Sequence, residues 1–197
     1  MQRKQDKIEK ILKSAEKLFS ANYYHNVSTN HIADLSGIPI GTLYGYFSRK
    51  SEIAEEIINS YINQTDQIFL RIKKQRGNSI VDAARGLISE SVRQIETSPF
   101  VLEVMIMSSM DYYPEELTGP LMLFRKRWQD NLCSIQSLSF MSAKATRLAY
   151  SYFVSHVCAS NQIRFVEAEA VDHLARYFDF LRTNDPAARL LFAERID

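Results

Sequence analysis

The side chains that could perform acid–base, nucleophilic or metal chemistry are few in this chain of 197 residues. Four histidines are scattered along it: His25, His31, His156 and His173. Neither Cys133 nor Cys158 has a second Cys or a His at metal-ligand spacing. No nucleophile–base motif and no glycine-rich phosphate loop occurs. We therefore expect no enzymatic activity, no metal ion and no cofactor.

One short segment is rich in side chains that form hydrogen bonds and apolar contacts. Residues 28–47 read STNHIADLSGIPIGTLYGYF. Ser28 or Thr29 can cap a helix, because a short side-chain oxygen satisfies the free N–H groups of its first turn. Two glycines and two tyrosines follow within the last seven residues, GTLYGYF.

These residues predict two short helices joined by a tight turn. The first helix carries Ile32, Ala33 and Leu35 and stops at Gly37, where a left-handed conformation costs glycine nothing. The second begins at Pro39, since a missing N–H is harmless at a first helical position. This arrangement is a helix-turn-helix, and its second helix would lie in the major groove of DNA.

The same residues resemble the tetracycline-repressor (TetR) family of bacterial regulators. The resemblance runs from about Ile8 to Ile58 and rests on ILKSAEKLF and on IA-x-x-S-G-I-P-x-G-T-L-Y-x-Y-F-x-x-K. Two positions depart from the family pattern: Tyr23 stands where Gly is usual, and Val27 stands where Thr is common. No motif is recognisable after about residue 60.

The resemblance implies roles for particular side chains. It assigns phosphate contacts to Tyr44, through its phenol, and to Lys50, near the start of a fourth helix whose free N–H groups also favour an anion. The remaining residues expected at DNA are Ser28, Thr29 and Asn30 on the first helix of the motif, and Ile40, Thr42, Gly45 and Tyr46 on the second. Since that second helix has no Arg, we expect recognition by apolar contacts and DNA shape.

Charge is unevenly placed, although the whole chain carries a net charge of only +1. Residues 1–50 contain eight Lys and Arg against four Asp and Glu, a net charge of +4. A basic end on a faintly acidic body is typical of a protein with one face for a polyanion.

Helical periodicity dominates the rest of the chain, and no strand alternation occurs. We predict an all-α fold of about nine helices, with a three-helix DNA-binding domain in residues 1–50 and a helical ligand-binding and dimerisation domain in residues 51–197. The charged N-terminus lacks the apolar run of a secretory signal, and no apolar run spans a membrane, so we expect a cytoplasmic protein.

In the resembled family, helices 5 to 7 enclose a ligand and helices 8 and 9 pair with a second subunit. Here the pairing helices would be residues 142–162 and 167–183. The expected ligand-binding residues are Phe100, Met105, Tyr112, Phe124, Trp128, Tyr152, Phe153 and His156. Aromatic and Met side chains suit an apolar or aromatic effector.

Two functions remain open from the sequence. The first is a ligand-responsive regulator, most simply a repressor that a small effector releases from a palindromic operator. The alternative is an architectural or chromosome-associated DNA-binding protein without a small-molecule effector. An enclosed cavity between helices 5 and 8 would favour the first.

Overall fold

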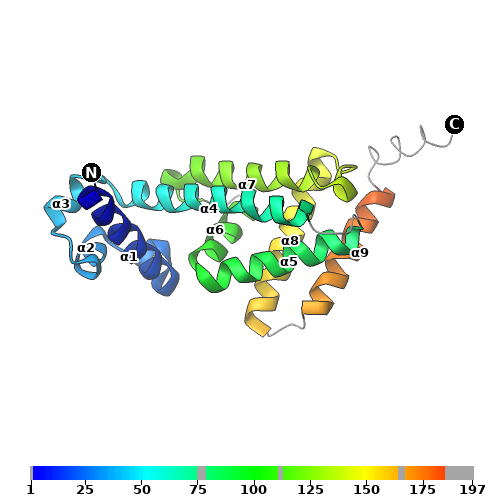
Figure 1. Cartoon of the computed structure of the whole chain (residues 1–197), viewed down its shortest axis with the longest axis horizontal. Helices are drawn as coiled ribbons and strands as arrows, with labels where there is room; N and C mark the ends of the chain where they lie inside the picture. Colours follow the sequence, from blue (N-terminus) through cyan, green and yellow to red (C-terminus); the bar gives the residue numbers. More distant parts are fainter. Residues whose placement is uncertain (1, 75–78, 111–112, 164–166, 185–197) are drawn as a thin grey trace.

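The computed structural model describes residues 2–74, 79–110, 113–163 and 167–184, and all regular structure in these ranges is helical (Figure 1). The elements are α1 (Gln2–Asn26), α2 (Thr29–Ser36), α3 (Ile40–Tyr44), α4 (Lys50–Lys74), α5 (Ile80–Thr97), α6 (Phe100–Ser109), α7 (Thr118–Cys133), α8 (Ala143–Ile163) and α9 (Glu167–Asn184), with short 3-10 turns η1 (Glu115–Leu117) and η2 (Gln136–Leu138). The predicted all-α fold is confirmed.

Helices α1, α2 and α3 form one end of an elongated molecule (Figure 1). Helix α1 buries Ile11, Ala15 and Phe19 at intervals of four residues, so that they lie on one face and pack on the helices that follow. The helix contains one interruption near its end. At Tyr23 the backbone has φ 61° and ψ 152°, a conformation that glycine adopts far more easily.

Helix α4 runs from the α1–α3 end into the body of the molecule and lies beside α7 (Figure 1). Its buried residues, from Ile53 through Ile58 and Tyr61 to Ile72, follow a helical period along its whole length. Tyr61 donates a hydrogen bond of 2.5 Å to Glu16 of α1, which joins the two helices. The predicted boundary between residues 50 and 51 falls at the start of this continuous helix.

The remaining helices build a second packed body, in which α5 lies against α9 and α8 against α9. Its centre is an aromatic cluster around Trp128 of α7. The Trp128 ring lies 5.1 Å from that of Phe69, 5.7 Å from that of Tyr150 and 5.1 Å from that of Phe153. These side chains come from α4, α7 and α8, so the cluster fixes the inner part of α4 to the body.

Candidate nucleic-acid interface

A small apolar core holds α2 and α3 in a fixed relation. Its buried members are Ile32 and Ala33 on α2, Ile38 in the turn, Leu43 on α3, and Phe47 just after it. Gly37 ends α2 in the left-handed conformation, with φ 65°, which glycine adopts without a penalty from a side chain. Thus the predicted helix-turn-helix is present, and its turn is made by the predicted glycine.

The start of α2 is fixed by a reciprocal pair of hydrogen bonds. The Ser28 side chain accepts from the backbone N–H of His31 at 3.2 Å, and His31 Nδ1 accepts from the backbone N–H of Ser28 at 3.4 Å. The predicted capping role of Ser28 is confirmed, and its hydroxyl is therefore already engaged. Asn30 is exposed beside it.

The two helices also meet through polar groups at their surface. The hydroxyls of Thr29 on α2 and Tyr44 on α3 share a hydrogen bond of 2.9 Å. The Tyr44 side chain is 49% exposed, so its hydroxyl is held in place and still reachable. Two predicted DNA contacts from different helices are brought together here.

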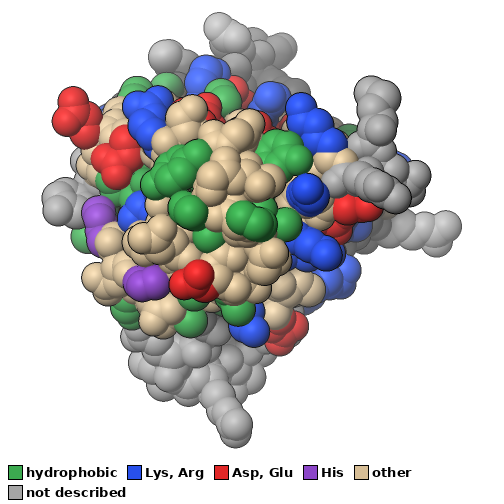
Figure 2. Space-filling view, turned by 90° about the vertical axis from the view of Figure 1, so that its left-hand side faces the viewer, with side chains coloured by type: hydrophobic (Ala, Val, Ile, Leu, Met, Phe, Trp, Pro, Cys, Tyr) green, Lys and Arg blue, Asp and Glu red, His purple; other side chains and the backbone are tan. Residues whose placement is uncertain are grey.

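The exposed side of this end is apolar at its centre. Tyr44, Ile40 (37% exposed) and Leu35 (45% exposed) are its large hydrophobic side chains. Of the three apolar residues that the sequence places on α2, Ile32 and Ala33 are buried and Leu35 is exposed. Figure 2 looks onto this end and shows hydrophobic and uncharged surface in the middle, with Lys and Arg side chains around much of it.

The other predicted residues of the motif differ in exposure. Gly45 is exposed, Thr42 is half-buried, and Tyr46 is half-buried and packs against the core. Gly41, which stands beside Ile40, is exposed, and a Cβ added there would meet nothing within 4 Å. The fold therefore does not need a glycine at this position.

Lys50 lies inward rather than free at the surface. Its Nζ donates a hydrogen bond of 2.7 Å to the backbone carbonyl of Tyr24 and lies 4.1 Å from the centre of the Tyr24 ring. Burial lowers the pKa of Lys50 from its ordinary value, while the carboxylates of Glu116 and Glu103 act in the opposite direction. Two of the three ammonium protons are not used by this carbonyl contact.

Tyr24 joins the α1–α3 end to the body of the molecule. Its backbone N–H donates to Glu103 of α6 at 3.2 Å, and its hydroxyl donates to Glu116 of η1 at 3.3 Å. Burial raises the pKa of the Glu103 carboxyl above its ordinary value, against the lowering effects of the Tyr24 N–H bond, His25 and Lys50. The end of α1, the start of α4 and two elements of the body thus meet at one polar cluster. Sequence reasoning missed it, since its members are far apart in the chain.

The predicted ligand-binding residues lie mainly in the packed interior. Phe100, Met105, Phe124, Trp128 and Phe153 are fully buried. The indole N–H of Trp128 is buried and has no hydrogen-bond partner among the described residues. Tyr152 is half-buried, and its ring stacks on that of Tyr177 of α9 at 3.9 Å. Tyr112 and the side chain of His156 lie outside the described residues.

Described residues line two open grooves, one between α4 and α5 and one between α8 and α9. None of the predicted ligand-binding residues lines either groove. Among the described residues, no group of three or more His, Cys, Asp and Glu side chains is placed to hold a metal ion. None of the described helices combines the length and hydropathy that crossing a lipid bilayer requires.

Comparison with known proteins places these features in a family context. Residues 11–57 match the family model described as "Bacterial regulatory proteins, tetR family". The chain is 27% identical over 128 residues to the uncharacterized HTH-type transcriptional regulator YxaF of Bacillus subtilis (strain 168). The matched part covers 63% of this chain and 66% of that protein, so the chain spans about two thirds of the length of this relative.

Solved structures share the fold at low sequence identity. A TetR transcriptional regulator from Rhodococcus sp. RHA1 has a TM-score of 0.62 at 18% identity, over 92% of this chain and 99% of that one. The transcriptional regulator FadR from Bacillus subtilis, in complex with stearoyl-CoA, has a TM-score of 0.61 at 17% identity. The match covers 86% of this chain and 96% of that one. E. coli NemR in its reduced form has a TM-score of 0.67 at 13% identity, and the match covers 85% of this chain and 95% of that one.

Proposed function

We propose that the chain is a transcriptional regulator of the tetR family of bacterial regulatory proteins, which its residues 11–57 match, and that it is a repressor that leaves a palindromic operator when a small effector binds. The observation that carries the proposal is the exposed face of α2 and α3. This face presents Tyr44 and Ile40 on an element that a buried core holds rigid. A rigid, uncharged surface with basic side chains around it fits a DNA groove.

Each predicted contact has a physical role in this proposal. The Tyr44 hydroxyl, oriented by Thr29, donates to a backbone phosphate oxygen. Ile40 and Thr42 place methyl groups against thymine, and Gly45 and Tyr46 border the groove. Ser28, Thr29 and Asn30 lie toward the flanking backbone, where the start of α2 offers its free N–H groups. Lys50 contributes a charge through its remaining ammonium protons.

A homodimer through α8 and α9 would present two such faces to one operator. Leu148 of α8 and Phe180 of α9 are exposed, at 48% and 58%, and both line the groove between these helices. Tyr177 lies beside Phe180, with ring centres 6.4 Å apart. An exposed apolar surface of this kind favours association with a second copy. Two recognition helices would then lie about 34–36 Å apart, one turn of DNA.

The effector would act by preferring one of two dimer conformations. We propose an apolar or aromatic molecule held near the aromatic cluster around Trp128. The unpartnered indole N–H of Trp128 supports this placement, because a buried donor without an acceptor is costly and an effector oxygen would satisfy it. The stearoyl-CoA in the FadR structure is an example of a ligand with a long apolar chain.

The proposal is tested by selecting binding sites for the purified chain from a random double-stranded DNA library. A repressor enriches one palindromic sequence, and its affinity for that sequence exceeds its affinity for unrelated DNA by about a thousandfold or more. Retention of all sequences with similar affinity would contradict the proposal and favour the architectural alternative.

A further inference from the structure

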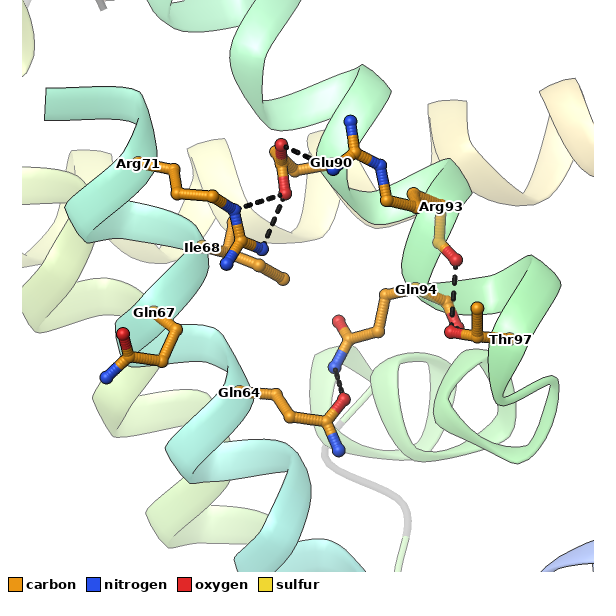
Figure 3. Close-up of a pocket in the computed structure, with 8 residues that line it drawn as sticks. All are labelled: Gln64, Gln67, Ile68, Arg71, Glu90, Arg93, Gln94 and Thr97. Atoms are coloured by element: carbon orange, nitrogen blue, oxygen red, sulfur yellow. Dashed lines mark hydrogen bonds and ion pairs between the residues drawn. The ribbon is translucent and has the colours of Figure 1, made fainter. Parts of the chain in front are cut away.

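The groove between α4 and α5 has the features of a small polar binding site (Figure 3). Its volume is about 340 Å³. Helix α4 contributes one wall and helix α5 the other. The lining residues are Gln64, Gln67, Ile68, Arg71, Glu90, Arg93, Gln94 and Thr97.

Gln94 brings an unused acceptor into this groove. The residue is only 6% exposed, and its Nε2 donates to Gln64 Oε1 at 3.2 Å. Its Oε1 atom is buried, and no group in the described part of the chain forms a hydrogen bond with it. In Figure 3 this oxygen points into the space between α4 and α5. Buried carbonyl oxygens are almost always satisfied, so this one is a place where a bound molecule would donate an N–H or O–H.

The groove also carries one excess positive charge. Glu90 is buried, and its Oε2 accepts two hydrogen bonds from Arg71, at 3.0 Å from Nε and 2.6 Å from Nη2. Arg93 Nη1 lies 3.5 Å from Glu90 Oε1. Two guanidinium groups thus face one carboxylate. Each guanidinium has five N–H donors, and these contacts leave several of them available.

The base of the groove offers a small apolar contact. Ile68 is almost fully buried between the polar side chains of α4. An alkyl chain of a few carbons can lie against it while the polar end of the same molecule reaches the arginines. The site therefore combines a cationic group, a hydrogen-bond acceptor and an apolar surface within one small volume.

We propose that this groove binds a short-chain hydroxycarboxylate. The carboxylate accepts charge-assisted hydrogen bonds from Arg93 and Arg71, the hydroxyl donates to Gln94 Oε1, and the chain lies on Ile68. This site is separate from the aromatic cluster around Trp128. A molecule bound here holds α4 to α5, and α4 begins at Lys50 beside the DNA-binding end. Its effect on DNA affinity rests on the proposed function, whereas binding itself does not.

The test uses isothermal titration calorimetry on the full chain with three probes. The first, 2-hydroxyhexanoate, carries both the charge and the donor. Hexanoate lacks the hydroxyl, and 1,2-hexanediol lacks the charge. Wild-type protein should bind 2-hydroxyhexanoate at least about fivefold more tightly than hexanoate and about tenfold more tightly than the diol.

Two variants and a matched control locate the site. Arg93→Gln should weaken binding of 2-hydroxyhexanoate about tenfold. Gln94→Met should remove the preference for 2-hydroxyhexanoate over hexanoate, because the acceptor for the hydroxyl is gone. Arg85→Gln is the control: Arg85 is an exposed arginine of the same helix, paired with Asp82 at 3.4 Å and outside the groove. It should leave both affinities unchanged.

Absence of binding to the wild type, or equal binding to Arg93→Gln and wild type, would overturn the proposal. The affinity for a selected operator is measured with and without 2-hydroxyhexanoate. An unchanged operator affinity would overturn the coupling to DNA. A chain that selects no operator would contradict the proposed function instead, and the calorimetry would still decide whether the groove is a binding site.

Discussion

The hydroxyl of Tyr44 is held by Thr29 before any DNA is bound. Orientation in advance reduces the entropy that would otherwise be lost when the side chain settles on a phosphate. In the proposed complex, Tyr44 would therefore bind a phosphate more strongly than its exposure alone indicates. Because Thr29 and Tyr44 share this hydrogen bond, their contributions are coupled, and each has to be removed in turn.

Tyr44→Phe removes only this hydroxyl. We expect operator affinity to fall about tenfold, because a hydrogen bond to a charged phosphate is lost. The free energy of unfolding should change by less than about 1 kcal/mol, since the residue is half exposed. Fluorescence anisotropy and urea denaturation measure the two quantities. Thr29→Val is the control, with a smaller loss expected; a larger loss than in Tyr44→Phe would assign the phosphate contact to Thr29.

Gly41→Ala should affect the free energy of unfolding and the operator affinity in opposite directions. Alanine is the better helix former, and its Cβ meets nothing within 4 Å, so the free energy of unfolding should rise by up to about 1 kcal/mol. Operator affinity should fall, because the methyl group would lie between the α3 backbone and DNA. Gly119→Ala on α7, where a Cβ is also unobstructed, should leave DNA binding unchanged. Equal operator affinity in both variants would place Gly41 away from DNA.

Tyr23→Gly tests the interruption of α1. Relief of the φ 61° conformation should outweigh the greater entropy of an unfolded glycine, for a net gain of about 1 kcal/mol in the free energy of unfolding. Tyr23→Ala keeps the unfavourable backbone and should show no gain. The urea midpoints of the two variants, each compared with that of the wild type, therefore separate the effect of the backbone conformation from the effect of losing the tyrosine ring.

At the scale of elements, the α2–α3 motif follows closely from the sequence. Ser28 and Gly37 determine the ends of α2 through interactions with residues close to them in the chain. The bounds of this helix can therefore be predicted from the local sequence. The position of Lys50 could not be predicted in this way, because its partner Tyr24 lies on another helix. The polar cluster around Glu103 escaped prediction for the same reason. The resemblance indicated the residues proposed to face DNA, and the surroundings of Lys50 among them depend on contacts between elements far apart in the chain.

Glu103→Gln tests the polar cluster where α1, α4 and α6 meet. Because the folded-state pKa of Glu103 is raised, the wild type loses stability as pH rises from about 4 through that pKa. The glutamine variant lacks this titration and can still accept from the Tyr24 N–H. The free energy of unfolding of the variant minus that of the wild type should therefore be larger at pH 7 than at pH 4. Urea denaturation at the two pH values measures the difference, and a difference independent of pH would contradict it.

At the scale of the whole molecule, the α2–α3 motif and helix α9 lie toward opposite ends (Figure 1). Association through α8 and α9 would leave both DNA-binding ends free. Phe180→Glu places a charge on the proposed dimer surface, and we expect a monomer in sedimentation velocity. Operator affinity should fall by about a hundredfold or more, since the two half-sites are no longer linked.

Leu123→Glu is the control for Phe180→Glu. Leu123 of α7 is exposed to a similar degree, at 48%, and does not line the groove between α8 and α9. This variant should remain dimeric and bind the operator normally. Dissociation of Leu123→Glu, with Phe180→Glu intact, would assign the dimer surface to α7 instead.

Helix α4 is continuous over 25 residues, and at 1.5 Å per residue it is a rod about 37 Å long. One end contacts α1, and the other packs against α7 in the body of the molecule. A tilt of about 5° at the end packed against α7 displaces the far end by about 3 Å, close to the rise of one DNA base pair. A small angular change in α4 is thus geometrically large enough to shift the α2–α3 motif by one step of the double helix.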